Sequence, residues 1–422
     1  MQSTDYELLD AADPLKDFRE QFIIPVINGK EQVYFLGNSL GLQPRTASWE
    51  ISNVLDQWAM YGVEGFFTGD KPWLEFHEQL KRPLASIVGA FPDEISVMNQ
   101  LTVNLHLMMV TFYRPNGKRK KIICEAKAFP SDQYMFETHL KSLGLDPEEV
   151  VIEVHPRRGE QTIRDEDIFQ TIDQHRDEIA LILWGGLNYY TGQAFDLKAV
   201  TKAGHDAGAM VGFDLAHAAG NIPLQLHDWN VDFACWCNYK YLNAGPGAVG
   251  AVFINEQHHR DESLHRFAGW WGYDLATRFQ MEKGFKPIQS AEGWQLSTPS
   301  MLLYATLKAS LDIFANAGIK QLHEKRRKLN AYLHQTLQHV NASLDEPIIE
   351  FITPINQSEP GCQVSLFMKS RGREIYDGLM QAGFIVDWRE PSVIRLAPVP
   401  LYNTFAEIAK FGEHLQTLIT TH

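Results

Sequence analysis

Two polar residues, Asp214 and Lys240, stand at or just beyond the ends of two apolar segments, so both could belong to one site. The segment 209–214, AMVGFD, ends in Asp214, and Lys240 comes three residues after the segment 231–237, VDFACWC. A lysine amine forms a Schiff base with a carbonyl compound, and an aspartate keeps a pyridine nitrogen protonated so that the ring accepts electrons. The pair therefore indicates a site for pyridoxal 5′-phosphate. The alternatives are an ion pair at the rim of a sheet and a lysine that points into solvent.

The apolar segments between residues 120 and 255 must position this pair. They alternate with amphipathic segments, one of which, 197–207, predicts a helix that stops at Gly208. Strand–helix alternation with nearly continuous apolar strands is typical of a mostly parallel, buried sheet. Ligands bind outside the carboxyl ends of such strands, which is where Asp214 and Lys240 stand. The expected strands are 121–125, 150–154, 180–185, 209–214, 231–237 and 248–254.

The pattern changes after residue 320. A long amphipathic helix, HEKRRKLNAYLHQTLQHV, precedes short strands at 348–353, 362–368, 383–387 and 392–398, and a last helix covers 405–418. The fold class is therefore α/β, with a mostly parallel sheet in a large domain and a smaller C-terminal α/β domain. The predicted division is an N-terminal arm and small-domain segment at 1–50, a large domain at 51–320 and a small domain at 321–422.

Composition excludes several classes of function. Lys plus Arg number 38 against 52 Asp plus Glu, a formal net charge of −14, which disfavours nucleic acid and anionic membranes as partners. Four cysteines do not make a disulfide framework. The first fifteen residues lack the apolar core of a secretory signal, and the apolar stretch 105–112 is too short to cross a bilayer. We expect a soluble cytoplasmic protein.

Several longer motifs resemble the kynureninases, which are fold type I pyridoxal-phosphate-dependent hydrolases of the aspartate aminotransferase superfamily. The resemblance implies hydrolytic cleavage of the Cβ–Cγ bond of L-kynurenine, with 3-hydroxykynurenine as a second substrate, in tryptophan catabolism. The products are anthranilate, or 3-hydroxyanthranilate, and L-alanine. In family order, from about residue 35 to 405, the motifs are FLGNSLGLQPR, LTVNLHL, FPSD, GFDLAHAAGN, HDWNVDFACWCNYKYLNAGPG and IRLAPVPLYN.

The resemblance assigns catalytic roles to three residues. Lys240 matches the Schiff-base lysine, and Asp214 matches the carboxylate that pairs with the pyridinium nitrogen. Tyr239 matches a tyrosine that contacts the phosphate and donates a proton. The structural alternative for Tyr239 is a ring that fills space beside Lys240.

It also implies a set of binding residues and an assembly. Arg395 matches the guanidinium that holds the substrate α-carboxylate, and Trp270 and Thr298 match positions that reach the site from the other subunit, so a homodimer is expected. No metal is expected. The remaining cofactor-binding positions are Leu101 and Thr102 at the phosphate, Phe129 on the ring face, and Ser131, Asp132 and His217 beside the ring.

Structural alternatives remain open for most of these residues. They are ordinary core for Phe129, a helix-start residue bonded to backbone for His217, an N-cap for Thr102, packing at a dimer interface for Trp270, and exposure on an edge strand for Arg395.

The chain departs from the family pattern at three positions. Animal members carry a histidine in the loop after the Tyr-Gly that matches Tyr61-Gly62, where this chain has Val63, and they carry an asparagine where this chain has Thr298. Both positions bear on the substituents of the substrate ring. These differences favour kynurenine over 3-hydroxykynurenine. Gly185 stands where some members have a serine that contacts the cofactor.

Other motifs point elsewhere and are weaker. Residues 245–250, GPGAVG, fit G-x-G-x-x-G, but the following AVFI predicts a strand where a dinucleotide site needs a helix. His258, His259 and His265 lie in a charged stretch and are expected to be solvated. A cysteine desulfurase or selenocysteine lyase of the same fold is the alternative enzyme, and its reactive thiol would have to be Cys362, which begins an apolar strand pattern. A non-catalytic binding protein is the second alternative.

Overall fold

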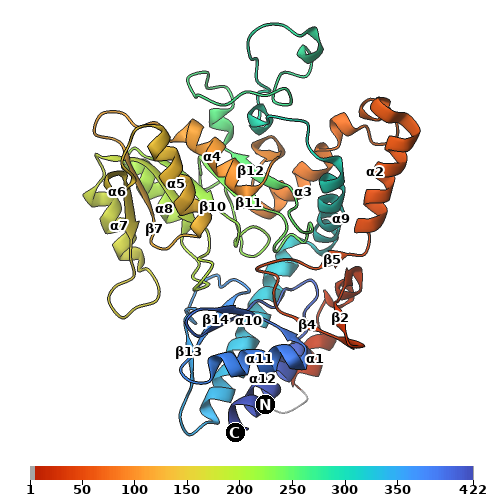
Figure 1. The fold of residues 1–422 in the computed structure, drawn as a ribbon, viewed down its shortest axis with the longest axis vertical. Helices are drawn as coiled ribbons and strands as arrows, with labels where there is room; N and C mark the ends of the chain where they lie inside the picture. The colour runs from red at the N-terminus through yellow and green to blue at the C-terminus, as the bar shows by residue number, and fades with distance from the viewer. Residues whose placement is uncertain (1–4, 422) are drawn as a thin grey trace.

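The computed structural model describes residues 5–421, and a seven-stranded sheet forms the middle of the molecule in Figure 1. The strand order is β6-β12-β11-β10-β9-β7-β8. The five strands β7 to β11 run parallel, while β12 is antiparallel to both its neighbours. All six expected strands are confirmed, and β6 was too short to be recognised. The bounds are β6 (Ile95–Val97), β7 (Lys121–Glu125), β8 (Val151–Val154), β9 (Ile179–Gly185), β10 (Met210–Asp214), β11 (Phe233–Cys237) and β12 (Gly250–Ile254).

Helices cover both faces of this sheet because its strands are apolar on both sides. Phe213 and Trp236 pack on one face with α3, while Cys235 packs on the other face with α4 and α5. The helix expected at 197–207 is α8, and the chain leaves it through Gly208 at φ 76°. The bounds are α2 (Ala47–Tyr61), α3 (Glu78–Val88), α4 (Leu101–Phe112), α5 (Pro130–Ser142), α6 (Pro147–Val150), α7 (Asp165–Gln174), α8 (Leu197–Asp206) and α9 (Met301–Ala317).

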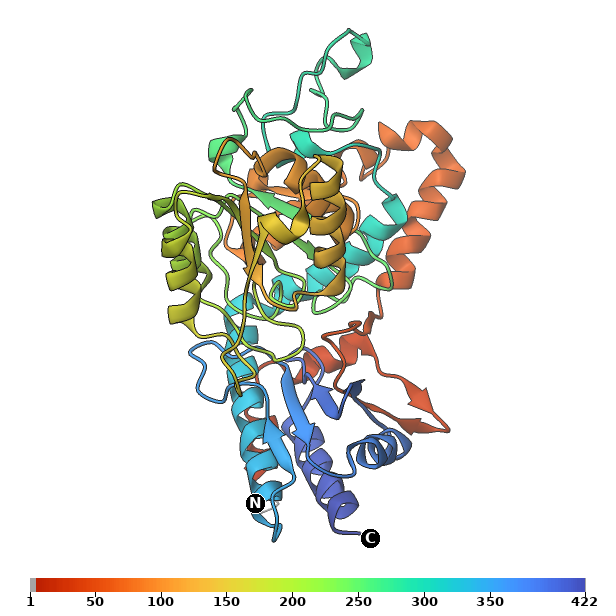
Figure 2. The ribbon, with the colours of Figure 1, turned by 60° about the vertical axis from the view of Figure 1, so that its left-hand side comes forward.

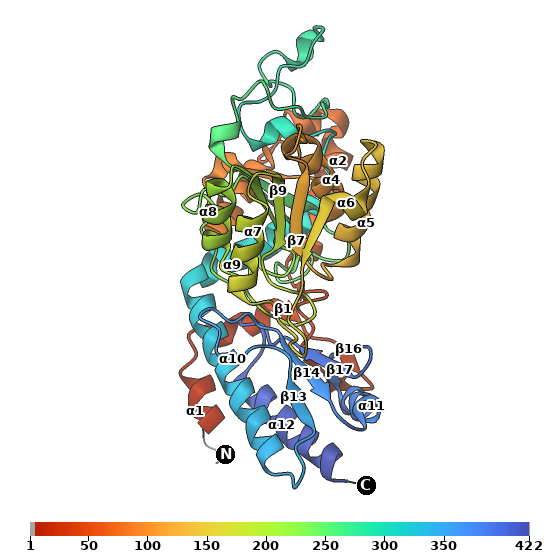
Figure 3. The same cartoon turned by 90° about the vertical axis from the view of Figure 1, so that its left-hand side faces the viewer.

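A second, antiparallel sheet has its own apolar core in the lower part of Figure 1. The helix α10 runs from the upper part down beside this sheet (Figure 3). The prediction of a single strand at 383–387 is wrong. Its first half pairs with β4 (Val33–Tyr34) near the N-terminus, and its second half joins the antiparallel sheet. The elements are α10 (Ile319–Ala342), β13 (Ile349–Phe351), β14 (Val364–Met368), α11 (Gly372–Ala382), β15 (Phe384–Ile385), β16 (Asp387–Arg389), β17 (Val393–Leu396) and α12 (Phe405–Thr420).

The N-terminal segment lies against both parts. Helix α1 packs on α12, and β4 pairs with β15. The antiparallel hairpin β2–β3 projects from the right-hand side of the molecule in Figure 2. The bounds are α1 (Asp5–Ala11), β1 (Phe22–Ile23), β2 (Val26–Ile27), β3 (Lys30–Glu31), β4 (Val33–Tyr34) and β5 (Gln43–Pro44).

The segment between β12 and α9 forms the loops at the top of Figures 1 and 2. The expectation that His258 and His259 are solvated is wrong. Both rings are buried: His258 Nε2 donates to Asp232 Oδ1 over 2.8 Å, and His259 Nε2 donates to the Ile254 carbonyl over 2.9 Å. Among the described residues, no helix is long and apolar enough to cross a membrane.

Candidate active site

A cavity of about 330 Å³ opens at the carboxyl ends of β7, β9, β10 and β11, and both Asp214 and Lys240 line it. It also contains most of the residues that the motifs singled out for the cofactor. The lining consists of Gln100, Leu101, Thr102, Glu125, Phe129, Ser131, Asp132, Gly185, Leu187, Tyr189, Asp214, Ala216, His217, Tyr239 and Lys240.

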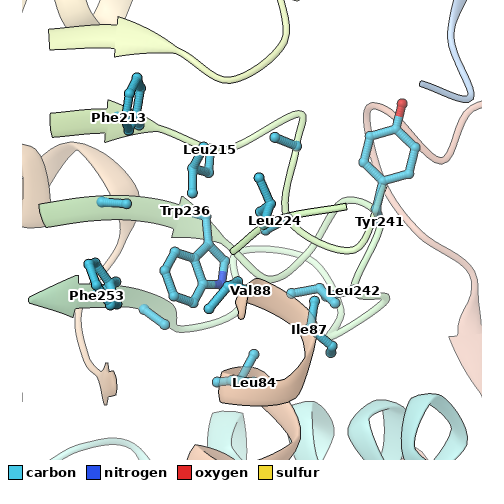
Figure 4. Close-up of a cluster of buried hydrophobic side chains, with 14 of the residues drawn as sticks. Leu84, Ile87, Val88, Phe213, Leu215, Leu224, Trp236, Tyr241, Leu242 and Phe253 are labelled. Atoms are coloured by element: carbon cyan, nitrogen blue, oxygen red, sulfur yellow. The ribbon is translucent and has the colours of Figure 1, made fainter. Parts of the chain in front are cut away.

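The loop that carries Lys240 is anchored in the core. Tyr241 and Leu242, which follow it, are buried in the cluster that includes Trp236 and α3 (Figure 4). The Asn238 amide, which accepts from the Trp236 indole N–H over 2.9 Å, donates to the Val249 carbonyl over 2.7 Å. This leaves the Lys240 amine at a defined place at the edge of the cavity.

Aromatic rings border that amine. Lys240 Nζ lies 5.7 Å from the centre of the Phe129 ring and 5.9 Å from that of Tyr239. Phe129 is 41% exposed and faces the cavity, so the interpretation as ordinary core is wrong. Burial raises the pKa of Tyr239, and its hydroxyl therefore keeps its proton.

Two aspartates share the floor of the cavity. Asp214 Oδ1 accepts the Ala216 N–H over 2.7 Å, and a side-chain hydrogen bond joins Asp132 to Asp214. Burial raises the pKa of both carboxyls, Asp132 the more strongly, while the Ala216 N–H and the Lys240 ammonium favour the charged form of Asp214. Asp132 therefore holds the proton and Asp214 the negative charge.

A third carboxyl, Glu125, was not expected in the site. It ends β7, lies 5% exposed, and accepts the Asn188 Nδ2–H over 2.8 Å. Burial and the charge of Asp214 raise the pKa of Glu125 to about 7, against its hydrogen bonds to Asn188 and the Gly185 backbone. The rule that identified Asp214, a polar residue at the end of an apolar strand, applies equally to this residue.

Unpaired polar atoms show that the cavity suits a polar ligand. Within residues 5–421, buried Asp132 Oδ1 and His217 Nδ1 have no hydrogen-bond partner, a state that proteins generally avoid. Burial lowers the pKa of His217, with the cations of Lys240 and Arg395 adding to it, so the ring is neutral. The interpretation of His217 as a helix-start residue bonded to backbone is wrong. The chemistry of these residues fits pyridoxal phosphate.

A helix N-terminus forms another wall. Helix α4 begins at Leu101, and its N-cap is Gln100, so the interpretation of Thr102 as an N-cap is wrong. Leu101 and Thr102 line the cavity at the end of the helix where free N–H groups favour a phosphate.

Arg395 lies behind this cavity and does not line it. It is 1% exposed on β17, a strand between β14 and β16, so the interpretation as an exposed edge residue is wrong. Its Nε donates to Asp387 Oδ2 over 2.8 Å, and its Nη1 donates to the carbonyl of Tyr189, which does line the cavity.

Trp270 and Thr298 lie outside the cavity of the single chain. Trp270 is 41% exposed in the loops between β12 and α9, where it packs edge-on against Phe279 at a centroid distance of 5.7 Å. Thr298 is exposed ahead of α9. A second subunit would be needed to bring them to a cofactor, and that remains a prediction.

Comparisons with known proteins agree with the motifs. Residues 33–362 match the model of the class-V aminotransferase family, and residues 322–415 match that of the kynureninase C-terminal domain. A kynureninase from Flavobacterium psychrophilum is 52% identical over 97% of this chain and 96% of its own length. One from Xanthomonas campestris pv. campestris (strain 8004) is 50% identical over the same shares.

Solved structures share the fold at low identity. The cystine C-S lyase C-DES superposes with a TM-score of 0.76 at 17% identity, covering 91% of this chain and 97% of the other. A cysteine desulfurase from Thermococcus onnurineus NA1 has a TM-score of 0.76 at 16% identity, covering 96% and 98%. These likenesses bear on the fold alone.

Proposed function

The chain belongs to the kynureninase family, and we propose that it hydrolyses L-kynurenine to anthranilate and L-alanine. It is a pyridoxal-phosphate-dependent hydrolase with the fold of the fold type I enzymes. The observation that carries the proposal is one cavity that joins the Lys240 amine to the Asp214 carboxyl, with unpaired polar atoms of Asp132 and His217 beside them.

Bound pyridoxal phosphate supplies an electron sink for the carbanion that the reaction needs. Lys240 would hold it covalently, and the charged Asp214 would keep its ring nitrogen protonated. Phe129 would cover the ring face, and Ser131 would add a polar contact beside it. Leu101 and Thr102, at the start of α4, would bind the phosphate.

Two residues of the site move protons. The Lys240 amine, which lines the cavity, would act as the base that removes the Cα proton of the substrate. Tyr239 keeps its phenolic proton, since burial raises its pKa, and delivers it to the carbon that becomes the alanine methyl group.

Arg395 is the residue proposed for the substrate α-carboxylate. Its buried guanidinium is linked to the cavity through the Tyr189 carbonyl, which accepts from Nη1, while Nε and Nη2 both donate to one oxygen of Asp387, Oδ2. A substrate carboxylate would bind on the side that faces the cavity.

We further propose a homodimer in the cytoplasm. Exposed apolar side chains lie on α2, on the segment that follows it and on the loops before α9, and Phe67 packs on Phe279 of those loops with ring centres 6.0 Å apart. Four free, buried cysteines suit a reducing compartment. The exposed apolar side chains are Trp49, Trp58, Met60, Tyr61, Val63, Phe67, Phe267, Trp270, Phe279 and Met281.

The test mixes purified, cofactor-loaded protein with L-kynurenine and follows anthranilate fluorescence. Lys240→Ala should lower kcat by about 10³-fold or more, since it removes the general base. A parallel assay with 3-hydroxykynurenine decides the ring preference, which Val63 and Thr298 tilt towards kynurenine. If yellow, cofactor-loaded protein cleaves neither compound, the proposal fails.

The desulfurase alternative has a separate assay. It needs a reactive thiol, but Cys362 is buried, and burial raises its pKa to about 12. We expect no sulfide from L-cysteine, and its release would revive that alternative.

A further inference from the structure

The Asn188 side chain has a fixed orientation that determines what Glu125 meets. Asn188 Oδ1 accepts the N–H groups of Tyr190 and Thr191 over 3.0 and 2.8 Å, and the Thr191 hydroxyl over 3.1 Å. Asn188 Oδ1 therefore faces the backbone of the turn 188–191, and Asn188 Nδ2 must face Glu125. The Glu125–Asn188 hydrogen bond ties the end of β7 to the turn 188–191.

The carbonyl groups of the turn 188–191 accept hydrogen bonds from side chains in and beside the C-terminal sheet. Gln363 Nε2 donates to Tyr189 O over 2.8 Å, and Ser365 Oγ donates to Tyr190 O over 2.6 Å. Arg395 Nη1 also donates to Tyr189 O. The turn is thus bonded on one side to a carboxyl in the cofactor cavity and on the other to the arginine proposed for the substrate.

We propose that Glu125 is a positioning residue that, through Asn188 and the turn 188–191, sets the place of Arg395 relative to the cofactor cavity. This inference rests on the proposed role of Arg395. It gives a purpose to a buried carboxyl that the proton transfers above do not use.

The surroundings of Glu125 show that its place is costly to maintain. The charges of Asp214 on β10 and Asp132 on α5 act on it, and Lys240 is the cation near the two aspartates. A Cβ at residue 185 would lie 2.3 Å from Glu125 Oε1, so the carboxyl occupies the space that a side chain there would take. A buried acid among like charges is kept where its hydrogen bonds are needed.

The test compares Glu125→Ala, Asn188→Ala and the double variant as holoenzymes. The first readout is the KM for L-kynurenine. The second is the L-alanine concentration that half-saturates a change in the visible absorption of the cofactor, since L-alanine carries the α-carboxylate without the scissile bond. We expect each single variant to raise both by about tenfold, with kcat within about threefold. The double variant should be no worse than either single one.

Two further variants serve as controls. Glu125→Gln keeps one oxygen for the Asn188 amide but replaces the other carboxyl oxygen by an N–H donor, and it should raise both readouts less than Glu125→Ala does. Glu153→Gln changes a partly exposed glutamate on the adjacent strand, which accepts a hydrogen bond from Gln133 over 3.0 Å and does not line the cavity, and it should change neither readout. Thermal unfolding checks that each variant folds, and Asn188→Ala tests the same path if Glu125→Ala does not fold.

Different outcomes overturn different statements. If Arg395→Lys leaves KM and the L-alanine titration unchanged, the proposed role of Arg395 is wrong and the inference falls with it. If that variant weakens binding but Glu125→Ala and Asn188→Ala do not, the inference alone is wrong. Strictly additive effects, or a changed cofactor absorption in Glu125→Ala only, would also overturn it, because Glu125 would then act on the cofactor directly.

Discussion

Two clusters of charged side chains in this protein are built from similar residues, but the pKa values of their members shift in opposite directions. The strand-end cluster consists of Glu125, Asp132, Asp214 and Lys240, three acids and one cation around a cavity. Burial raises the pKa of each of its three acids and so favours their neutral forms.

The helix cluster consists of His77, Glu78, Lys81 and Glu292, where α3 meets the short helix η7 (Ala291–Trp294). Glu292 binds His77 over 2.9 Å and Lys81 over 3.1 Å. Burial opposes the charge on His77, but the hydrogen bonds of Glu292 and Glu78 outweigh it and raise its pKa to about 9. The His77 hydrogen bond lowers the pKa of Glu78 to about 2.

The contrast distinguishes a closed ion-pair network from a site built for a ligand. In the helix cluster two acids face two cations. Ligand atoms of His77, Glu78 and Glu292 lie within 4.8 Å of one another, as around a metal ion. The Lys81 ammonium, however, forms ion pairs with both glutamates. In the strand-end cluster the acids are in excess and polar atoms stay unpaired. Both clusters line a cavity, so it is the direction of the pKa shifts and the unpaired polar atoms that separate them: the acids of the strand-end cluster shift towards neutrality, and His77 and Glu78 shift towards charge.

The largest expected effect comes from breaking the helix cluster. Glu292→Ala leaves His77 and Lys81 without their buried partner and should lower the free energy of unfolding by about 3–5 kcal/mol, measured by urea denaturation. Glu78→Ala, at the exposed side of the same cluster, should cost less than about 1 kcal/mol. Equal losses of unfolding free energy in the two variants would contradict the view that the buried Glu292 matters more for stability than the exposed Glu78.

The Glu125 carboxyl of the strand-end cluster should make the free energy of unfolding depend on pH. The pKa of Glu125 is about 7 in the folded chain against its ordinary 4.5, so the unfolded chain releases this proton first as pH rises. The free energy of unfolding should therefore fall between pH 4.5 and 7, by roughly 3 kcal/mol in total. Glu125→Gln should remove this part of the slope, and an unchanged slope would contradict the assignment.

Charge at Asp214 should matter more for turnover than charge at Asp132. Asp214→Asn should lower kcat on the order of 10²-fold, since the ring nitrogen loses its anionic partner. Asp132→Asn imitates a carboxyl that already holds its proton and should cost no more than about tenfold. Steady-state kinetics on cofactor-loaded protein decides, and the reverse order would exchange the two roles.

The smallest expected effect tests the fit around Glu125. In Gly185→Ala the added methyl group would lie 2.3 Å from Glu125 Oε1, so the carboxyl must move. We expect a loss of about 1–2 kcal/mol in the free energy of unfolding. Glu125→Ala combined with Gly185→Ala should lose less than the sum of the two single variants, because the collision partner is gone.

What could be predicted from the sequence depended on local pattern. The six long strands follow from apolar runs, and Asp214 and Lys240 were located because polar residues at strand ends gather on one edge of a parallel sheet. Glu125 obeys the same rule at the end of KIICE and could have been found by it. The motifs led to the same cavity by resemblance.

What only the tertiary structure decided are contacts between residues far apart in the chain. Glu292 meets His77 across more than two hundred residues, β15 pairs with β4 near the other terminus, and Asp232 takes His258 out of solvent. No local period encodes such partners, since each depends on how separate elements pack. The sequence by itself determined which strands form and where their chemistry lies, and packing decided which charges are buried, and against what.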